Sequence, residues 1–274
     1  MHRGVFMLVT ALCLLGAKVH GQEWEIGIQG GASGYMGDLN PENPIAFNDW
    51  SAAFMVKYNI DHTWGLRANF AYANIWAADH NSGVAQRRNR NLSFFGEVKE
   101  VSLIADFNFF RWLPQRGRLV YTPYIFAGIA GIAFEPKNYL PSSGETIKLR
   151  ELQTEYDPIL NPAKYRTRAI AIPFGAGFKY NLRGPWSVGV EVGYRVALTD
   201  YLDDVSGNYA KAPNFPSNIN FSDWFWLTYG HAPATPSTVG VGTQRGDGRP
   251  NDSYMTAGIT LSFTLFKGGC PEWR

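Results

Sequence analysis

The feature that most constrains this sequence is a period of two: apolar residues recur at every second position in eight separate segments. Each segment is roughly ten residues long, the length of a strand that crosses a membrane at a tilt. Alternation of this kind predicts β-strands with one apolar face. The segments cover residues 24–32, 50–58, 64–72, 101–109, 124–134, 170–180, 186–194 and 255–265. We therefore expect an all-β fold in which eight antiparallel strands close into a barrel.

The alternation fits two kinds of barrel. In a soluble barrel the apolar face points inward, and in a membrane barrel it points to lipid. The connections favour the membrane barrel, because short turns on one rim and long loops on the other are typical of outer-membrane proteins. The predicted long connections are 34–49, 74–96, 136–167 and 199–251, and the short ones are 60–63, 110–118 and 181–185.

Aromatic residues at the ends of the apolar rows also favour the membrane barrel, because amphipathic rings prefer the membrane interface. They are Trp24, Trp50, Tyr58, Trp64, Tyr72, Tyr180, Trp186 and Tyr194. The apolar rows are then expected to face lipid. In the fifth segment this row consists of Tyr124, Phe126, Gly128, Ala130, Ile132 and Phe134.

The composition agrees with an exported barrel. Charged residues make up 18% of the chain, against about 25% in soluble domains. The 25 basic and 23 acidic residues are nearly balanced, which argues against a nucleic-acid binder.

The N-terminus resembles a secretory signal peptide, with Arg3, an apolar run over residues 5–15 and a small residue, Gly21, at the predicted cleavage site. A membrane anchor and lipidation at Cys13 are the alternatives. We expect a signal peptide over 1–21, a barrel over 22–267 and a short tail over 268–274. An even number of strands would then place both termini of this multi-pass outer-membrane protein in the periplasm.

The positions that face the lumen carry four acids and four bases. An eight-stranded barrel has room only for its own side chains or one small ligand, and buried charges must be paired. The pattern therefore predicts a self-neutralising plug with negligible conductance, with a proton or ion path and a gated pore as alternatives. This lumen charge network comprises Glu25, Lys57, Arg67, Glu100, Asp106, Lys179, Glu191 and Arg195.

No catalytic, cofactor-binding or metal-binding motif is evident, and we expect a non-enzymatic protein without a cofactor. Three histidines outside the signal peptide, His62, His80 and His231, fall in predicted turns or loops. A nucleophile–base pair built from them stays an open alternative, because sequence does not give their spacing in space.

An acidic loop motif follows the seventh segment. Its spacing does not match that of a calcium-binding loop, so we expect its carboxylates to accept hydrogen bonds within the loops. The motif comprises Asp200, Tyr201, Asp203 and Asp204.

The tail contains the single cysteine that remains after removal of the signal peptide. Cys270 follows two glycines, and Trp273 is an aromatic residue of a kind often found at interfaces. An unpaired cysteine in an oxidising compartment suggests either a free thiol or an intermolecular disulfide. We expect Cys270 and Trp273 to contact a periplasmic partner.

Several short stretches resemble one known family. They are 35–40 (YMGDLN), 90–94 (RNLSF), 107–110 (FNFF), 122–124 (TPY), 172–175 (IPFG), and 194–195 (YR) running into 199–206 (TDYLDDVS). Together they are similar to the outer-membrane β-barrel family of Bacteroidota that includes PorG, a component of the type IX secretion system. The similarity extends over nearly the whole mature chain.

The resemblance implies a scaffold in outer-membrane lipid that docks a periplasmic lipoprotein and its ring partner, PorK- and PorN-like, to the membrane. The alternative is a generic OmpA-like surface barrel whose long loops bind external ligands or cells. Removing the tail should harm a scaffold, and removing residues 207–249 should harm a surface binder.

Overall fold

The computed structural model describes residues 23–43, 45–112, 120–155, 164–209, 219–230 and 242–265. The predicted signal peptide and the predicted tail lie outside these ranges. The strands within them are β1 (Glu23–Met36), β2 (Asp49–Asn59), β3 (Trp64–Ala78), β4 (Ser93–Asn108), β5 (Tyr121–Tyr139), β6 (Thr146–Lys148), β7 (Arg168–Arg183), β8 (Trp186–Ala197) and β9 (Ser253–Leu265). The helices are η1 (Asp79–Asn81), α2 (Ala85–Arg90), α3 (Leu149–Leu152) and α4 (Phe221–Tyr229).

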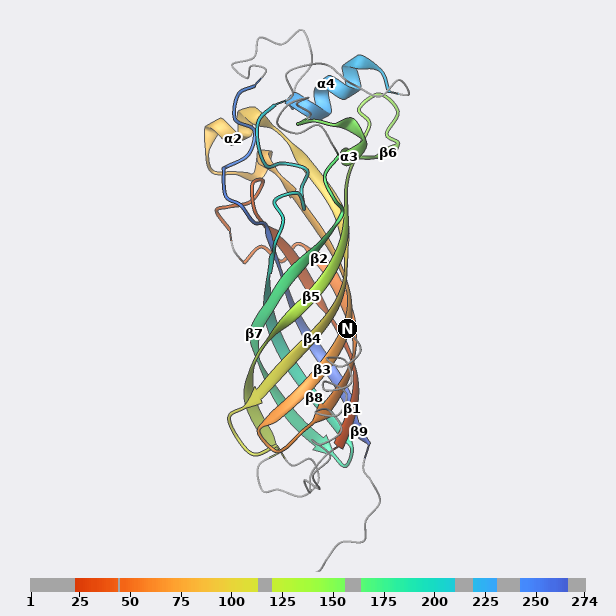
Figure 1. Cartoon of the computed structure of the whole chain (residues 1–274), viewed down its shortest axis with the longest axis vertical. Coiled ribbons are helices and arrows are strands. Elements are labelled where there is room, and N and C mark those ends of the chain that lie inside the picture. Colours follow the sequence, from red (N-terminus) through yellow and green to blue (C-terminus); the bar gives the residue numbers. More distant parts are fainter. Residues whose placement is uncertain are drawn as a thin grey trace, which may run out of the picture.

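Eight of these strands form a closed antiparallel barrel, as the sequence predicts. The order around the barrel is β1-β2-β3-β4-β5-β7-β8-β9, and β9 pairs with β1. The three-residue strand β6 is an addition to β5. Figure 1 shows the short turns at one end of the barrel and the long connections, with α2, α3 and α4, at the other.

The outer face of the barrel is an apolar band. Ile28, Val101 and Ile259 point outward and are 59%, 58% and 62% exposed. Aromatic pairs lie at both edges of the band: Trp24 and Tyr58 have ring centres 4.9 Å apart at the short-turn end, and Trp50 and Tyr72 stack at 5.3 Å toward the long-loop end. A closed barrel with an apolar exterior and two aromatic girdles spans a membrane.

None of the helices in the described ranges is long and apolar enough to cross a membrane.

Several strands continue beyond their predicted ends at the long-loop side, most clearly β4, which begins at Ser93 rather than at residue 101. There the pattern is reversed. Glu97 and Lys99 point outward and form an ion pair at 3.5 Å, while Phe94 and Val98 are buried inside. A search for apolar residues on the outer face misses this part of the strand, because its outer face contacts water instead of lipid.

The expected orientation of the fifth segment is wrong. In β5 the predicted lipid-facing row points inward, with Tyr124 6% and Phe126 3% exposed, whereas Ile125 and Ile129 face outward. Both faces of this strand are apolar, because its inner face packs against Ile104 and a core above it. Alternation therefore could not show which row faces lipid.

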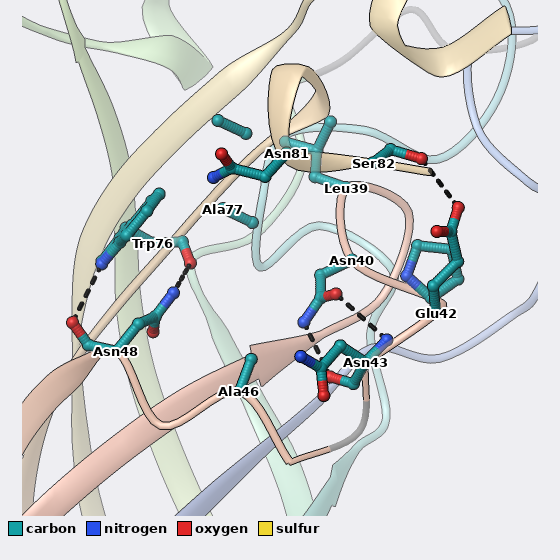
Figure 2. A pocket seen from close by; sticks show the side chains of 12 residues that line it. Leu39, Asn40, Glu42, Asn43, Ala46, Asn48, Trp76, Ala77, Asn81 and Ser82 are labelled. Atoms are coloured by element: carbon teal, nitrogen blue, oxygen red, sulfur yellow. Dashed lines mark hydrogen bonds between the residues drawn. The ribbon is translucent and has the colours of Figure 1, made fainter. Parts of the chain in front are cut away.

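The connection between β1 and β2 folds back against the outside of the barrel. The Ala46 carbonyl packs so closely on Gly34 that a Cβ at that position would have no room. The backbone N–H of Asn48 donates to the Ser33 carbonyl at 3.0 Å and continues the pairing of the two strands. This arrangement leaves a cavity between the connection and the end of β3 (Figure 2).

Candidate functional site

The lumen charge network lies inside the barrel, and the structure buries all of its members. Their exposed fractions run from 1% for Asp106 and Arg195 to 6% for Lys179. The residues fall into a lower group, nearer the short turns, and an upper group. The lower group comprises Glu25, Lys57, Arg67, Asp106, Lys179 and Glu191, and the upper group comprises Glu100 and Arg195.

Asp106 and Arg67 connect the lower group. The Lys57 Nζ lies 2.6 Å from the Asp106 Oδ2, and the Arg67 Nη2 lies 3.4 Å from the Asp106 Oδ1. The Arg67 Nη1 donates to the Glu191 Oε2 at 2.7 Å, and the Tyr124 hydroxyl donates to the same oxygen at 2.8 Å. Strands on different sides of the barrel are thereby linked across the lumen.

Lys179 and Glu25 complete the lower group through other contacts. The Lys179 ammonium lies 4.5 Å from the centre of the Trp112 ring and 5.3 Å from that of Tyr124, in the range of cation–π attraction. Glu25 accepts a hydrogen bond from the Ser262 hydroxyl. The aromatic rings that hold this lysine could not be identified from the strand pattern.

The upper group is a separate network around Glu100. The Arg195 Nε donates to the Glu100 Oε2 at 3.2 Å, and the Tyr254 hydroxyl donates to the same oxygen at 2.7 Å. Ser102 donates to the Glu100 Oε1 at 2.7 Å. Because charged and hydroxyl groups satisfy this carboxylate together, the barrel interior accommodates its charge.

The side chains leave almost no open space in the lower lumen. The cavity between Glu25, Lys57, Asp106 and Lys179 measures about 20 Å³, which is room for roughly one water molecule. The long-loop side of the barrel is filled by a hydrophobic core that includes Ile132, Phe134 and Leu152. The described interior is therefore packed rather than open to solutes.

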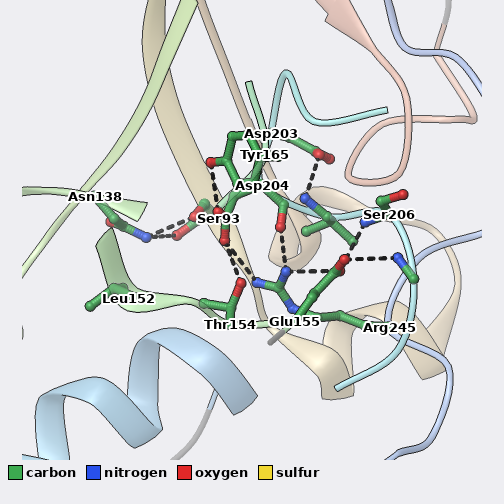
Figure 3. Close-up of polar contacts among 12 residues, drawn as sticks. Ser93, Asn138, Leu152, Thr154, Glu155, Tyr165, Asp203, Asp204, Ser206 and Arg245 are labelled. Carbon is green, nitrogen blue, oxygen red and sulfur yellow. Dashed lines mark hydrogen bonds and ion pairs between the residues drawn. The ribbon is translucent and has the colours of Figure 1, made fainter. Parts of the chain in front are cut away.

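The long connections pack over this core as a folded cap. The motif carboxylates that the sequence singles out lie in it, and Asp203 and Asp204 are each 1% exposed. Asp204 accepts hydrogen bonds from the Thr154 and Tyr165 hydroxyls, both at 2.7 Å (Figure 3). The Tyr201 ring stacks on that of Tyr165 with centres 4.4 Å apart. Asp200 precedes these residues in the same connection and is half-buried.

Arg245 is the main cation of the cap and was not identified from the sequence. Its guanidinium lies 3.1 Å from Glu155 and 3.4 Å from Asp204, and its side chain is buried (Figure 3). Burial raises the pKa of Asp204 to about 6, although the charge of Arg245 opposes that shift. No periodic pattern marks Arg245, because it lies in an irregular connection.

A second carboxyl cluster surrounds Tyr35. The Tyr35 hydroxyl lies 2.7 Å from Asp203 Oδ2 and 2.7 Å from Asp252 Oδ1. A tyrosine hydroxyl has one proton, so it donates to one carboxyl only, and a proton on the other carboxyl completes the second hydrogen bond. Burial, together with repulsion between the carboxylates, raises the pKa of both Asp203 and Asp252 well above its usual range. Burial also raises the pKa of nearby Asp38 to about 8.

Three of the stretches that carry the family resemblance, 35–40, 90–94 and 199–206, meet in this cap, while 107–110, 122–124 and 172–175 lie in the barrel strands or at their short-turn ends. Tyr35 and Asp203 come from two of them and share a hydrogen bond. Arg90, from a third, donates to the Asp38 carbonyl at 3.0 Å and makes a two-bond ion pair with Asp79 at 2.7 Å. Residues from these three stretches thus form one packed unit.

The remaining candidates are dispersed. His62 lies in the tight β2–β3 turn and His80 in η1, at opposite ends of the barrel, while His231, Cys270 and Trp273 lie outside the described residues. Within the described part of the chain, no three His, Cys, Asp or Glu side chains are arranged to hold a metal ion.

Comparison with solved structures finds other membrane barrels. A major outer-membrane protein of Thermus thermophilus is 13% identical, with 90% of this chain and 100% of that chain covered and a TM-score of 0.43. Ail, the attachment invasion locus protein of Yersinia pestis in complex with the heparin analogue sucrose octasulfate, is 9% identical over 90% and 100%, with a TM-score of 0.41. The N-terminal barrel of Pseudomonas aeruginosa OprF is 12% identical over 88% and 97%, with a TM-score of 0.37. The strand pairing itself, rather than these similarities, establishes the barrel.

No curated protein sequence matches the chain. A family model does match, over residues 3–234, which include most of the barrel and part of the cap. The chain therefore belongs to the family described as Domain of unknown function (DUF6089).

Proposed function

We propose that this protein is a non-enzymatic outer-membrane scaffold of the type IX secretion machinery, which docks a periplasmic lipoprotein and ring component, PorK- and PorN-like, to the membrane. The observation that carries the proposal is the packed lumen. A barrel whose described interior leaves about 20 Å³ between its ion pairs acts through its surfaces rather than through a pore. The assignment to the type IX secretion machinery rests on the sequence resemblance to PorG-like proteins.

The proposed orientation places the short turns in the periplasm and the long-loop cap outside the cell. β1 begins and β9 ends at the short-turn rim, since Trp24 pairs with Leu265 there. Both termini would then be periplasmic. Cys270 and Trp273 follow β9 within a few residues, which favours a partner contact, including an intermolecular disulfide through Cys270, just beneath the membrane.

The test is an affinity pull-down from detergent-solubilised membranes without reductant, separated first under non-reducing and then under reducing conditions. Wild type and Cys270→Ser are compared side by side. We expect a lipoprotein and a ring component to co-purify, with the lipoprotein leaving the diagonal in wild type only.

Two other outcomes would correct the proposal. Co-purification from both forms without an off-diagonal spot would retain the scaffold and refute the disulfide. A barrel that purifies alone would refute the secretion role.

An OmpA-like surface barrel that binds external ligands or cells is the second candidate, and the folded cap favours it. Helix α4 presents Phe221 and Trp226, which are 45% and 40% exposed, at the end of the molecule (Figure 1). Truncation after Phe266 should abolish secretion if the protein is a scaffold, whereas the double change Phe221→Ser and Trp226→Ser should not. The opposite pattern, with loss of adhesion, would favour the surface binder.

A further inference from the structure

The cavity beside the end of β3 has the size and lining of a small-molecule site. It measures about 300 Å³ and lies between the β1–β2 connection, β3 and η1. Sites for small molecules start at roughly this volume and combine apolar walls with a few polar groups. Here the apolar wall includes Leu39 and Trp76, and side-chain amides of Asn43, Asn48 and Asn81 lie around it (Figure 2).

The amides retain free hydrogen-bonding groups. Asn48 donates through Nδ2 to the Trp76 carbonyl at 3.3 Å, and its side-chain Oδ1 accepts from no residue in the described ranges. Asn43 accepts through Oδ1 from the Ile45 backbone N–H at 3.2 Å, and its side-chain Nδ2 donates to none of the described residues. Asn81 makes no side-chain hydrogen bond to any residue in the described ranges, so it offers both a donor and an acceptor.

The cavity contains no uncompensated charge. Glu42 is the charged residue among the described residues that line it. Its carboxylate accepts hydrogen bonds from the Ser82 hydroxyl at 2.7 Å and the Gly83 N–H at 3.0 Å, and Arg87 lies 3.6 Å away. A ligand here meets amide donors and acceptors beside a carboxylate that already has its partners, which favours a neutral molecule.

The cavity lies on the outside of the barrel, beyond the membrane. Trp76 belongs to the outward-facing row of β3 and lies four residues past Tyr72 of the aromatic girdle, or about 13 Å along the strand. Its neighbour across the sheet is Phe95, beyond the outward ion pair of Glu97 and Lys99. In the orientation proposed above, this is the level of sugars attached to outer-leaflet lipids.

The geometry points to a binding site for a neutral sugar ring. A sugar presents hydroxyls that donate and accept at once, which matches free amide groups. It also presents an apolar C–H face, which packs against the face of an indole such as Trp76. The sugar can belong to a lipid-linked glycan or to a free oligosaccharide, and the recognition chemistry is the same for both.

The test uses the full-length protein in phospholipid nanodiscs. Saturation-transfer NMR measures binding of a set of neutral oligosaccharides, and a tripeptide mixture serves as a competing class of ligand. In a parallel arm, sugar analysis measures the intact lipopolysaccharide retained by the purified protein. The variants are Asn81→Ala and Trp76→Leu, with Asn89→Ala, an exposed asparagine on α2 outside the cavity, as the matched control.

We expect Asn81→Ala to weaken oligosaccharide binding about three- to tenfold, the effect of a lost hydrogen bond. Trp76→Leu should weaken it at least as much, and Asn89→Ala should leave it unchanged. An effect on lipopolysaccharide retention alone would assign the site to a lipid-linked glycan. Absence of binding in both arms, equal binding by all variants, or preference for the tripeptides would overturn the proposal. These measurements involve no periplasmic partner, so their failure can be told apart from a failure of the pull-down that tests the proposed function.

Discussion

At the scale of single residues, the lumen ions contribute to stability as members of a network rather than as isolated pairs. Asp106 contacts both Lys57 and Arg67, and Arg67 also contacts Glu191. Removing one partner from such a network leaves a buried charge uncompensated, which costs more than the pair itself contributes. The most sensitive residue is therefore the shared one.

We expect Asp106→Asn to lower the free energy of unfolding by about 3–5 kcal/mol. Urea titration, followed by the electrophoretic shift between folded and unfolded barrel, measures the loss. The control is Lys99→Gln, which removes an ion pair with Glu97 whose lysine side chain is 63% exposed, and it should cost less than about 1 kcal/mol. Equal losses in the two variants would contradict a network role for Asp106.

The sequence predicted the members of this network but not their partners. Alternation assigns a residue to the inner face, and that was sufficient for all eight charged residues. It does not give the height of a residue in the barrel, which depends on the register between strands. Arg195 and Glu100 pair although 95 positions separate them, and the indole that holds Lys179 comes from the β4–β5 connection.

At the scale of elements, the cap is a unit of its own with its own charge balance. Its carboxyls Asp38, Asp203 and Asp252 have raised pKa values because they are buried close to one another. The folded cap therefore binds more protons than the unfolded chain, and its stability falls as the pH rises.

The pKa values of these carboxyls set the pH range over which the stability of the cap falls. It begins near pH 4, where free aspartate titrates, and extends to pH 8, since the pKa of Asp38 is about 8. Hydrogen exchange should show faster opening around Tyr35 and Asp203 at pH 8 than at pH 5, and Asp252→Asn should reduce the difference. After correction for the pH dependence of intrinsic amide exchange, the β7–β8 turn, 181–187, which contains no acid or histidine, is an internal control that should not respond. Faster opening at the lower pH would refute the shared proton.

Arg245→Met tests whether the cap can open without the barrel. The change leaves Glu155 and Asp204 without their cation, and the cap should lose about 3 kcal/mol of stability. Limited proteolysis should then cleave the long connections while the strands stay protected in the membrane. Loss of the whole barrel at the same protease concentration would show that cap and barrel unfold together.

Sequence reasoning found the strands but missed the elements of the cap. Asn220 is the N-cap residue of helix α4, and its side chain accepts from the Asp223 N–H at 2.7 Å. This sequence signal is short and lies within a long predicted loop. The extension of β4 was missed because the outward face changes from lipid to water near Lys99. The rule that outward-facing residues are apolar therefore holds only for the part of each strand that lies within the membrane.

At the scale of the whole molecule, the filled lumen predicts a membrane protein that conducts no ions. Purified wild-type protein in a planar bilayer should give no reproducible single-channel openings, while a porin added to the same membrane confirms that insertion is detectable. Reproducible openings from the pure protein would mean that the packed interior rearranges in the bilayer.

The pairing of β1 with β9 also has a consequence for how the chain assembles. The ladder extends from Trp24–Leu265 to Met36–Ser253, so it joins residues that are among the most distant in the sequence. Such contacts form late, because a long loop must close before they become favourable. Until β9 arrives, β1 and β8 each present an unpaired strand edge, which is prone to wrong association. Strands β1 to β8 must therefore remain an incomplete sheet that is shielded from other chains. The barrel closes only when β9, its most C-terminal strand, pairs with β1.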